Sequence, residues 1–352
     1  MSLLRFSVPE LQTVRGAGLG NEVRGWAKAL IGAHELGLRA VHPPWGLNAR
    51  GYRRDFGTSI FDWPATQALR ALPSITVDTN LAGRHEDYAE VMAELREHVA
   101  RTRGPLVVWH TSGMAGGSSS IRRARPLIRA ELTRPAHVAG NLYQIEKRLD
   151  PRRLTIALHI RAGDFGASHQ GPRPGEFNRM VPIGWYRNIA RDVRRRIGDA
   201  AQFLVFTDDP ANPDIRRLSN ELRAVPLPER RRPMLSDVLT MAQADLLVCS
   251  VSSLSILAAY LSEKPYIWYG PHLGEIGEWQ GIWAHEPGQR QGLTARNATG
   301  TPLPGLLTRG MAADEAGVVS GPLTALLEQV LALKDVRRDL IMYGVVPRTE
   351  DR

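Results

Sequence analysis

LTIALHIRAGDF, residues 154–165, decides the fold class and marks the first candidate site. Its first seven residues form an apolar run of the length and composition typical of a strand buried in a parallel sheet. His159 lies near the end of that run, and Arg161 and Asp164 follow it. Ligands bind outside the carboxyl ends of the strands in open parallel sheets. We therefore expect these three side chains to line a binding site, with a buried Arg–Asp ion pair and a structural histidine as the alternative.

Strand-like and helix-like segments alternate along the chain around this stretch. Strands are predicted at residues 39–41, 74–77, 105–109, 154–160, 203–206, 246–249 and 266–269, and helices at 21–36, 85–101, 136–149, 182–197, 212–221, 236–243, 253–262 and 322–333. Such alternation predicts parallel sheets covered by helices on both faces. A length of 352 residues fits two domains. The expected fold is α/β, with two Rossmann-like domains at residues 1–145 and 146–352 that face a cleft.

The composition is that of a water-soluble globular protein, with 43% hydrophobic and 23% charged residues. A single cysteine, Cys249, excludes a disulfide framework and indicates a reducing compartment. The first residues lack the apolar core of a signal peptide, and the longest apolar run is too short and too rich in serine to span a bilayer. We expect a cytoplasmic protein without a transmembrane segment.

The formal net charge is +9, and 41 of the 45 basic residues are arginines. This bias is compatible with nucleic-acid binding, with a GC-rich genome, or with affinity for an anionic small molecule or membrane surface. The arginines are scattered and no aromatic residues are interleaved with them, which disfavours nucleic acid as a partner.

Two further segments place polar side chains after a predicted strand. FLVFTDDP, residues 203–210, ends in Thr207, Asp208 and Asp209, and the alternative there is an Asp-capped helix with Pro210 in its first turn. SVSS, residues 250–253, brings Ser252 and Ser253 to the start of a helix, where hydroxyls and free N–H groups favour an anion. The alternative for the serines is a helix cap alone.

The glycines of GAGLGN, residues 16–21, are spaced as G-x-G-x-G, without a clear strand before them, so they are a weak dinucleotide signature. The sequence contains no D-x-D, no P-loop, no G-x-S-x-G, no H-E-x-x-H and no Cys/His cluster with zinc spacing. No cofactor or metal is expected. Without such motifs, Arg161 is the residue best suited to hold phosphate oxygens, because a guanidinium binds them bidentately.

The order of the motifs resembles the GDP-fucose-dependent fucosyltransferase superfamily, which includes the α1,2-, α1,6-, protein O- and nodulation-factor fucosyltransferases. The resemblance rests on G-x-G-N, H-x-R-x-G-D, VPIGWY, T-D-D-P, D-x-x-x-M and LLVCS-x-SS, which lie between residues 16 and 269. It implies a GT-B-type fold, with an acceptor-side N-terminal domain and a nucleotide-sugar-binding C-terminal domain. It also implies an inverting, metal-independent transfer of fucose, or a related sugar, from a GDP-sugar to a hydroxyl of a glycan or glycoconjugate.

The resemblance also implies residue roles. Arg161 would bind the β-phosphate, and the other donor-binding residues would be Asn21, His159, Tyr186, Thr207, Asp208, Asp209, Asp237, Ser252 and Ser253. The general base would be Glu176, with Asp164 as the alternative; Asp164 could also serve only as the ion-pair partner of Arg161. Ala162 stands where some branches carry a second arginine. A non-catalytic carbohydrate- or nucleotide-binding relative is the second functional hypothesis.

Overall fold

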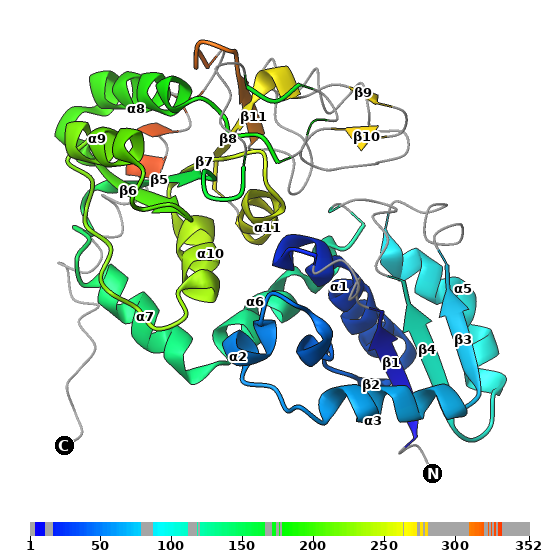
Figure 1. Cartoon of the computed structure of the whole chain (residues 1–352). Coiled ribbons are helices and arrows are strands. Elements are labelled where there is room, and N and C mark those ends of the chain that lie inside the picture. Colours follow the sequence, from blue (N-terminus) through cyan, green and yellow to red (C-terminus); the bar gives the residue numbers. More distant parts are fainter. Residues whose placement is uncertain are drawn as a thin grey trace, which may run out of the picture.

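The computed structural model describes residues 4–10, 17–78, 87–111, 118, 120–165, 171–173, 176, 178–262, 264–272, 275–276, 279–280, 310–319, 323, 325, 327–328 and 330–332. It has two main sheets, and every strand pair within them is parallel. Helices alternate with the strands along the chain (Figure 1). The expected α/β class is confirmed.

The N-terminal sheet has four strands in the order β2-β1-β4-β3. These strands are β1 (Arg5–Pro9), β2 (Arg39–Ala40), β3 (Ser74–Val77) and β4 (Leu106–His110). The helices between and beside them are α1 (Leu19–Leu36), η2 (Trp45–Leu47), α2 (Tyr52–Phe56), α3 (Asp62–Ala68), η3 (Leu69–Ala71) and α5 (Tyr88–Arg101).

Helices α1 and α5 cover one face of this sheet, and the segment α3–η3 contributes to the other. Ser7 of β1 points to the α1 side, because its hydroxyl donates to the carbonyl of Ala29 at 2.7 Å. Val8 points to the opposite side, where it clusters with Val107 and Trp109 beneath the partly buried Leu69. This alternation is the period of two expected along a strand.

The C-terminal sheet has five strands in the order β11-β8-β7-β5-β6. The strands are β5 (Leu154–Ile160), β6 (Ala201–Thr207), β7 (Leu246–Val248), β8 (Tyr266–Tyr269) and β11 (Gly310–Ala313). The helices are η4 (Arg122–Ala124), α6 (Arg125–Thr133), α7 (Ala136–Glu146), α8 (Ile183–Ile197), η5 (Gly198–Ala200), α9 (Pro213–Glu221), α10 (Met234–Gln243), α11 (Ser253–Leu261) and η6 (Gly270–His272). A short antiparallel pair, β9 (Glu275–Ile276) and β10 (Trp279–Gln280), completes the described elements.

Strand β5 is an interior strand of this sheet, between β6 and β7, and all seven of its residues are buried. Helix α8 lies on one side of the sheet, and α10 and α11 lie on the other (Figure 1). The apolar side chains of α8 recur at helical spacing from Ile183 to Val193. They therefore form one face of the helix, and this face is buried. The continuous apolar run of β5 thus follows from a strand covered on both faces.

Buried apolar side chains from both halves belong to one connected core. Helix α11 of the C-terminal half packs against α1 of the N-terminal half (Figure 1). The hydroxyl of Tyr260 on α11 also donates to the carbonyl of Ile121 at 2.8 Å. The two sheets are therefore joined by direct packing beside α1 and α11.

Several predicted elements are observed with the same bounds, among them β3, β5 and β8. The sequence missed β1, which lies before the glycine-rich segment in the chain, so the prediction of no clear strand before those glycines is wrong. It also missed the short helices α2, α3 and α6. The strand β1 escaped notice because it is only five residues long and contains polar Arg5 and Ser7.

Candidate functional site

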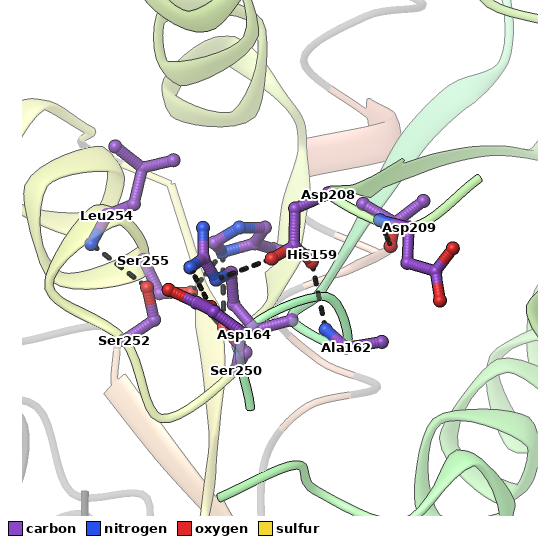
Figure 2. Close-up of polar contacts among 11 residues, drawn as sticks. His159, Ala162, Asp164, Asp208, Asp209, Ser250, Ser252, Leu254 and Ser255 are labelled. Carbon is purple, nitrogen blue, oxygen red and sulfur yellow. Dashed lines mark hydrogen bonds and ion pairs between the residues drawn. The ribbon is translucent and has the colours of Figure 1, made fainter. Parts of the chain in front are cut away.

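Strand β5 is the topological switch point of the C-terminal sheet. The chain leaves β5 for β6 on one side and later crosses to β7 on the other side. In open parallel sheets such a reversal leaves a crevice outside the carboxyl ends of the strands. The residues that follow β5, β6 and β7 converge there (Figure 2).

Arg161 follows β5 directly and is held by two carboxylates. Its Nη2 donates to Asp164 Oδ1, and its Nε lies 3.3 Å from Asp208 Oδ2. The guanidinium also lies over the ring of Phe165, 5.0 Å from its centroid. The side chain of Arg161 is 19% exposed and that of Asp164 is 54% exposed. The expected Arg–Asp pair is therefore formed, but at the open edge of the sheet and not within a sealed core.

Asp208, which follows β6, fixes the backbone after β5. Its Oδ1 accepts the N–H of Ala162 at 2.9 Å. Partial burial would raise the pKa of Asp208, but the N–H groups of Ala162 and Gly163 and the charge of Arg161 together hold it below the usual range. Gly163 lies against this carboxylate, since a Cβ there would be 3.0 Å from Asp208 Oδ2. The carboxylate thus stays charged at neutral pH and orients both the loop and Arg161.

His159 is buried and links β5 to the start of α11. Its Nδ1 lies 2.6 Å from Ser255 Oγ and 3.3 Å from Ser250 Oγ. Burial, with the nearby charge of Arg161, lowers the pKa of His159 to about 3, so the imidazole is neutral at pH 7. Ser255 also accepts the N–H of Ser250 at 3.1 Å. Ser255 was missed, although its place three residues after Ser252, on the buried face of the same helix, could have indicated it.

Ser252 caps α11, and its hydroxyl accepts the N–H of Leu254 at 3.1 Å. The helix cap, which was the alternative interpretation of the serines, is thus observed. Ser253 begins the helix and packs against the start of α1, where a Cβ on Gly20 would clash with the Ser253 carbonyl and a Cβ on Gly18 would lie 3.1 Å from its hydroxyl. Asn21 lies in the first turn of α1. The amino ends of two helices, one from each half, therefore lie side by side, and both carry positive partial charge.

Thr207 and Asp209 form a turn after β6, in which Thr207 Oγ1 accepts the N–H of Asp209 at 3.1 Å. The Asp-capped helix start with Pro210 is wrong. Asn212 caps α9 by accepting the N–H groups of Asp214 and Ile215, and Pro213 is its first residue. The two aspartates are therefore not used as helix caps.

A pocket of about 270 Å³ lies between β6 and α9. Its lining residues are Val205, Thr207, Pro210, Ile215, Arg216, Ser219 and Asn220. Ligand sites for drug-sized molecules usually enclose ≈ 300–1,000 Å³. This pocket is therefore too small to hold a whole nucleoside diphosphate. Among the predicted site residues, Thr207 at the carboxyl end of β6 also lines this pocket.

Asp237 lies in the first turn of α10 and pairs with Arg230. Burial raises the pKa of Asp237 to about 6, although the charge and hydrogen bond of Arg230 oppose the shift. The sequence did not reveal this partner. Asp237 could bind the nucleobase of a donor only if Arg230 shares the Asp237 carboxylate with the nucleobase or releases it.

The contacts of Tyr186 and Glu176 are with residues other than those described above. The Tyr186 side chain is fully buried in α8, next to Trp185, and burial raises its pKa well above the usual range. Glu176 accepts the N–H of Arg173 at 2.8 Å and lies 3.3 Å from Arg179 Nη1. Neither Tyr186 nor Glu176 is among the labelled residues of the close-up, where His159, Asp164, Asp208 and the serines lie together (Figure 2).

Within the described ranges, no group of three or more His, Cys, Asp or Glu side chains is placed so that it could hold a metal ion. The same part of the chain has no helix long and apolar enough to cross a membrane. Trp45 and Trp109 are buried in the core, while the side chain of Trp279 lies outside the described residues. Cys249 is buried and free.

Comparisons of the chain with protein-family models, with curated proteins and with solved structures find no match. The functional conclusion therefore depends on the motif order and on the geometry of the carboxyl edge.

Proposed function

We propose that the chain is an inverting, metal-independent glycosyltransferase of the GT-B type, which transfers fucose or a related sugar from a GDP-sugar to a hydroxyl of a glycan or glycoconjugate. The observation that carries the proposal is the position of Arg161. Its guanidinium, on a side chain that is 19% exposed, follows β5 at the switch point, beside the capped start of α11. This is where a parallel sheet offers a crevice for a nucleotide.

The chemistry of such a transfer suits this arrangement. The acceptor oxygen forms a bond to the anomeric carbon while the bond from that carbon to the β-phosphate oxygen breaks. Negative charge then grows on the leaving diphosphate, and a fixed guanidinium with helix N–H groups stabilises it. Arg161 would supply the guanidinium, and the free N–H groups at the start of α11 would supply the donors. The proton of the acceptor hydroxyl would pass to a carboxylate, either Glu176 or Asp164.

For Arg161 to bind a diphosphate, the ligand has to take the place of a carboxylate. Asp164 is the more exposed of its two partners, at 54% against 25% for Asp208. Asp208 is also tied to the backbone of Ala162. Asp164 is therefore the partner that would be displaced, which leaves it free to act as a base or to turn toward solvent.

One observation favours the second candidate function, a non-catalytic nucleotide- or carbohydrate-binding relative. Both carboxylates proposed as the base are engaged in ion pairs, Asp164 with Arg161 and Glu176 with Arg179. If neither is released when an acceptor binds, the cleft would bind a donor without transferring the sugar.

Calorimetry in EDTA tests the donor assignment. Wild-type protein is expected to bind GDP, and Arg161→Ala is expected to lose about a hundredfold in affinity, by analogy with the loss of one charge-stabilising group. Arg187→Ala is the matched control, because Arg187 lies in an ion pair with Glu221 at 2.8 Å on α8. Binding of UDP without binding of GDP would overturn the guanine assignment.

Single-turnover assays with GDP-fucose and a panel of glycan acceptors separate the two candidate functions. Release of GDP in step with acceptor modification supports the transferase. Tight binding of the donor, which then stays intact with every acceptor, supports the binding protein. Failure of any GDP-sugar to bind rejects the transferase and the nucleotide-binding relative.

A further inference from the structure

Three large apolar side chains are exposed next to one another at the start of α3. Ile60 is 60% exposed, Phe61 is 70% exposed and Trp63 is 42% exposed. The other large hydrophobic side chains exposed in the described residues lie apart from these in the sequence; they are Leu4, Leu127, Tyr143 and Val318. Single exposed apolar residues are ordinary, whereas the largest apolar patch on a monomer is often functional. We call Ile60, Phe61 and Trp63 the α3 patch.

The α3 patch is presented on ordered backbone. Ser59 holds the turn, since its carbonyl accepts the N–H of Asp62 at 3.4 Å and its hydroxyl accepts that of Phe61 at 3.1 Å. The carbonyl of Phe61 in turn accepts the N–H of Ala65 at 3.1 Å. The apolar side chains are therefore held outward by a structured turn and helix and are not part of a loose tail.

Helix α3, which begins within the α3 patch, extends the apolar surface, and the residue that follows α3 packs on the sheet. Pro64, Ala65 and Ala68 of α3 are exposed as well. Leu69, which follows α3 directly, packs on the sheet cluster that contains Trp109. In Figure 1, α3 lies along the bottom of the N-terminal sheet, on the side away from the C-terminal sheet and its carboxyl edge. A partner on the patch would leave the candidate site open.

Basic residues flank the α3 patch on both sides in the chain. Residues 50–70 contain four arginines and two aspartates. Arg50 and Arg54 are exposed before the patch. Arg70 follows it, and 55% of its side chain is exposed although it pairs with Glu10 at 3.8 Å and lies over the Trp109 ring. The whole chain carries +9. Aromatic and aliphatic side chains beside arginines are the combination that binds the interface of an anionic bilayer.

We propose that the α3 patch docks the protein onto an anionic membrane surface, with Phe61 and Trp63 inserted at the level of the headgroups and the flanking arginines against lipid phosphates. The size of the patch favours a membrane over a second copy of the chain. With 60%, 70% and 42% of their surfaces exposed, the three side chains expose roughly 250–450 Å² together, since a large apolar side chain has about 150–250 Å² of surface. A stable protein interface needs about 800 Å² from each partner.

Co-sedimentation of the full chain with lipid vesicles tests the inference. Wild-type protein is expected to bind vesicles of phosphatidylcholine with about 30% phosphatidylserine, to bind pure phosphatidylcholine weakly, and to lose binding as salt is raised. The triple variant Ile60→Ser/Phe61→Ser/Trp63→Ser is expected to lose roughly tenfold or more of the partition coefficient. Tyr143→Ser, at an aromatic residue that is 59% exposed on α7, is the matched control and should bind as the wild type does.

A second measurement does not depend on the folding of the triple variant. Brominated lipids in the anionic vesicles should quench part of the wild-type tryptophan fluorescence. The Trp63→Phe variant keeps the apolar surface, so it should still bind the vesicles but should no longer show this quenching. The inference is overturned if wild-type protein does not bind anionic vesicles. It is also overturned by a folded triple variant that binds as well as wild type, or by a wild-type dimer in solution that the triple variant converts to a monomer.

Discussion

Gly20 of α1 lies directly against the carbonyl oxygen of Ser253 in α11, so the amino ends of two helices from the two halves of the chain are in van der Waals contact. A side chain at position 20 would clash with that oxygen, which belongs to backbone and cannot rotate away. The second glycine of G-x-G-N is thus explained by close packing between the halves, whatever ligand binds beside it.

Gly20→Ala is expected to destabilise the protein by about 1–3 kcal/mol, because the backbones of α1 and α11 must move apart. Gly140→Ala is the control, since α7 leaves open space around that position and alanine favours a helix interior. Chemical denaturation should show a loss for the first variant and a small gain for the second. Equal effects of the two substitutions would contradict the close approach.

Ser255→Ala is expected to cost about 1–3 kcal/mol, since it leaves the buried Nδ1 of His159 without its partner at 2.6 Å and removes the acceptor of the Ser250 N–H. Ser252→Ala, which removes the cap of α11, should cost about 1 kcal/mol. The free energies of unfolding of Ser255→Ala, His159→Gln and the Ser255→Ala/His159→Gln double variant measure the coupling between the two residues. Additive effects at Ser255 and His159 would show that the pair is not linked.

Acid should weaken the fold through His110. Ser7 uses its own proton on Ala29, so His110 Nε2 donates to Ser7 at 2.8 Å and its Nδ1 accepts from the Tyr88 hydroxyl at 2.8 Å. Burial, with the charge of Lys28, lowers the pKa of His110 to about 3, whereas a histidine in the unfolded chain titrates near 6.5. Between these values the unfolded chain binds the proton and the folded chain does not.

Stability is therefore expected to fall as the pH drops below about 6, by roughly 1 kcal/mol per pH unit from this residue. His110→Gln should be less stable at pH 8 and should lose less on acidification, because glutamine does not titrate. Urea unfolding at pH 8 and pH 5 measures both quantities. The same slope in wild type and variant would rule out His110 as a source of the acid sensitivity.

Asn212→Ala is expected to cost about 1 kcal/mol, because Asn212 accepts two N–H groups at the start of α9. Asp209→Ala, three residues earlier, should change stability by less, since the Asp209 side chain does not cap the helix. Under the proposed function it should instead weaken GDP binding. Thermal unfolding and calorimetry of the two variants distinguish these roles, and a larger loss of stability at Asp209 would count against the observed cap.

Asp164→Asn is expected to tighten GDP binding, since it removes the exposed carboxylate that competes with phosphate for Arg161. The gain should be no more than about fivefold, because exposed ion pairs contribute little. Transfer of the sugar should be lost if Asp164 is the base and should persist if Glu176 is. Weaker GDP binding in this variant would show that Asp164 supports the phosphate site and does not compete with it.

Many individual residues of the candidate site could be predicted from the sequence. The contacts between those residues and their partners could not. The polar residues after β5, β6 and β7 are recognisable because each follows an apolar run, and a parallel sheet brings the carboxyl ends of its strands to one edge. The partners of Asp237 and Glu176 are not recognisable in this way, since Arg230 and Arg179 reach them from turns whose conformation has no periodic signal.

By itself, the sequence determined the α/β class and the placement of most strands and helices, because apolar periodicity and helix-boundary residues act over a few neighbours. The tertiary structure decided the order of the strands, and with it the switch point at β5. It also decided the contact of Ser255 with His159, 96 positions away, and the packing of Gly20 on Ser253. Such pairs are selected by how whole layers pack, and no local pattern in the chain encodes them.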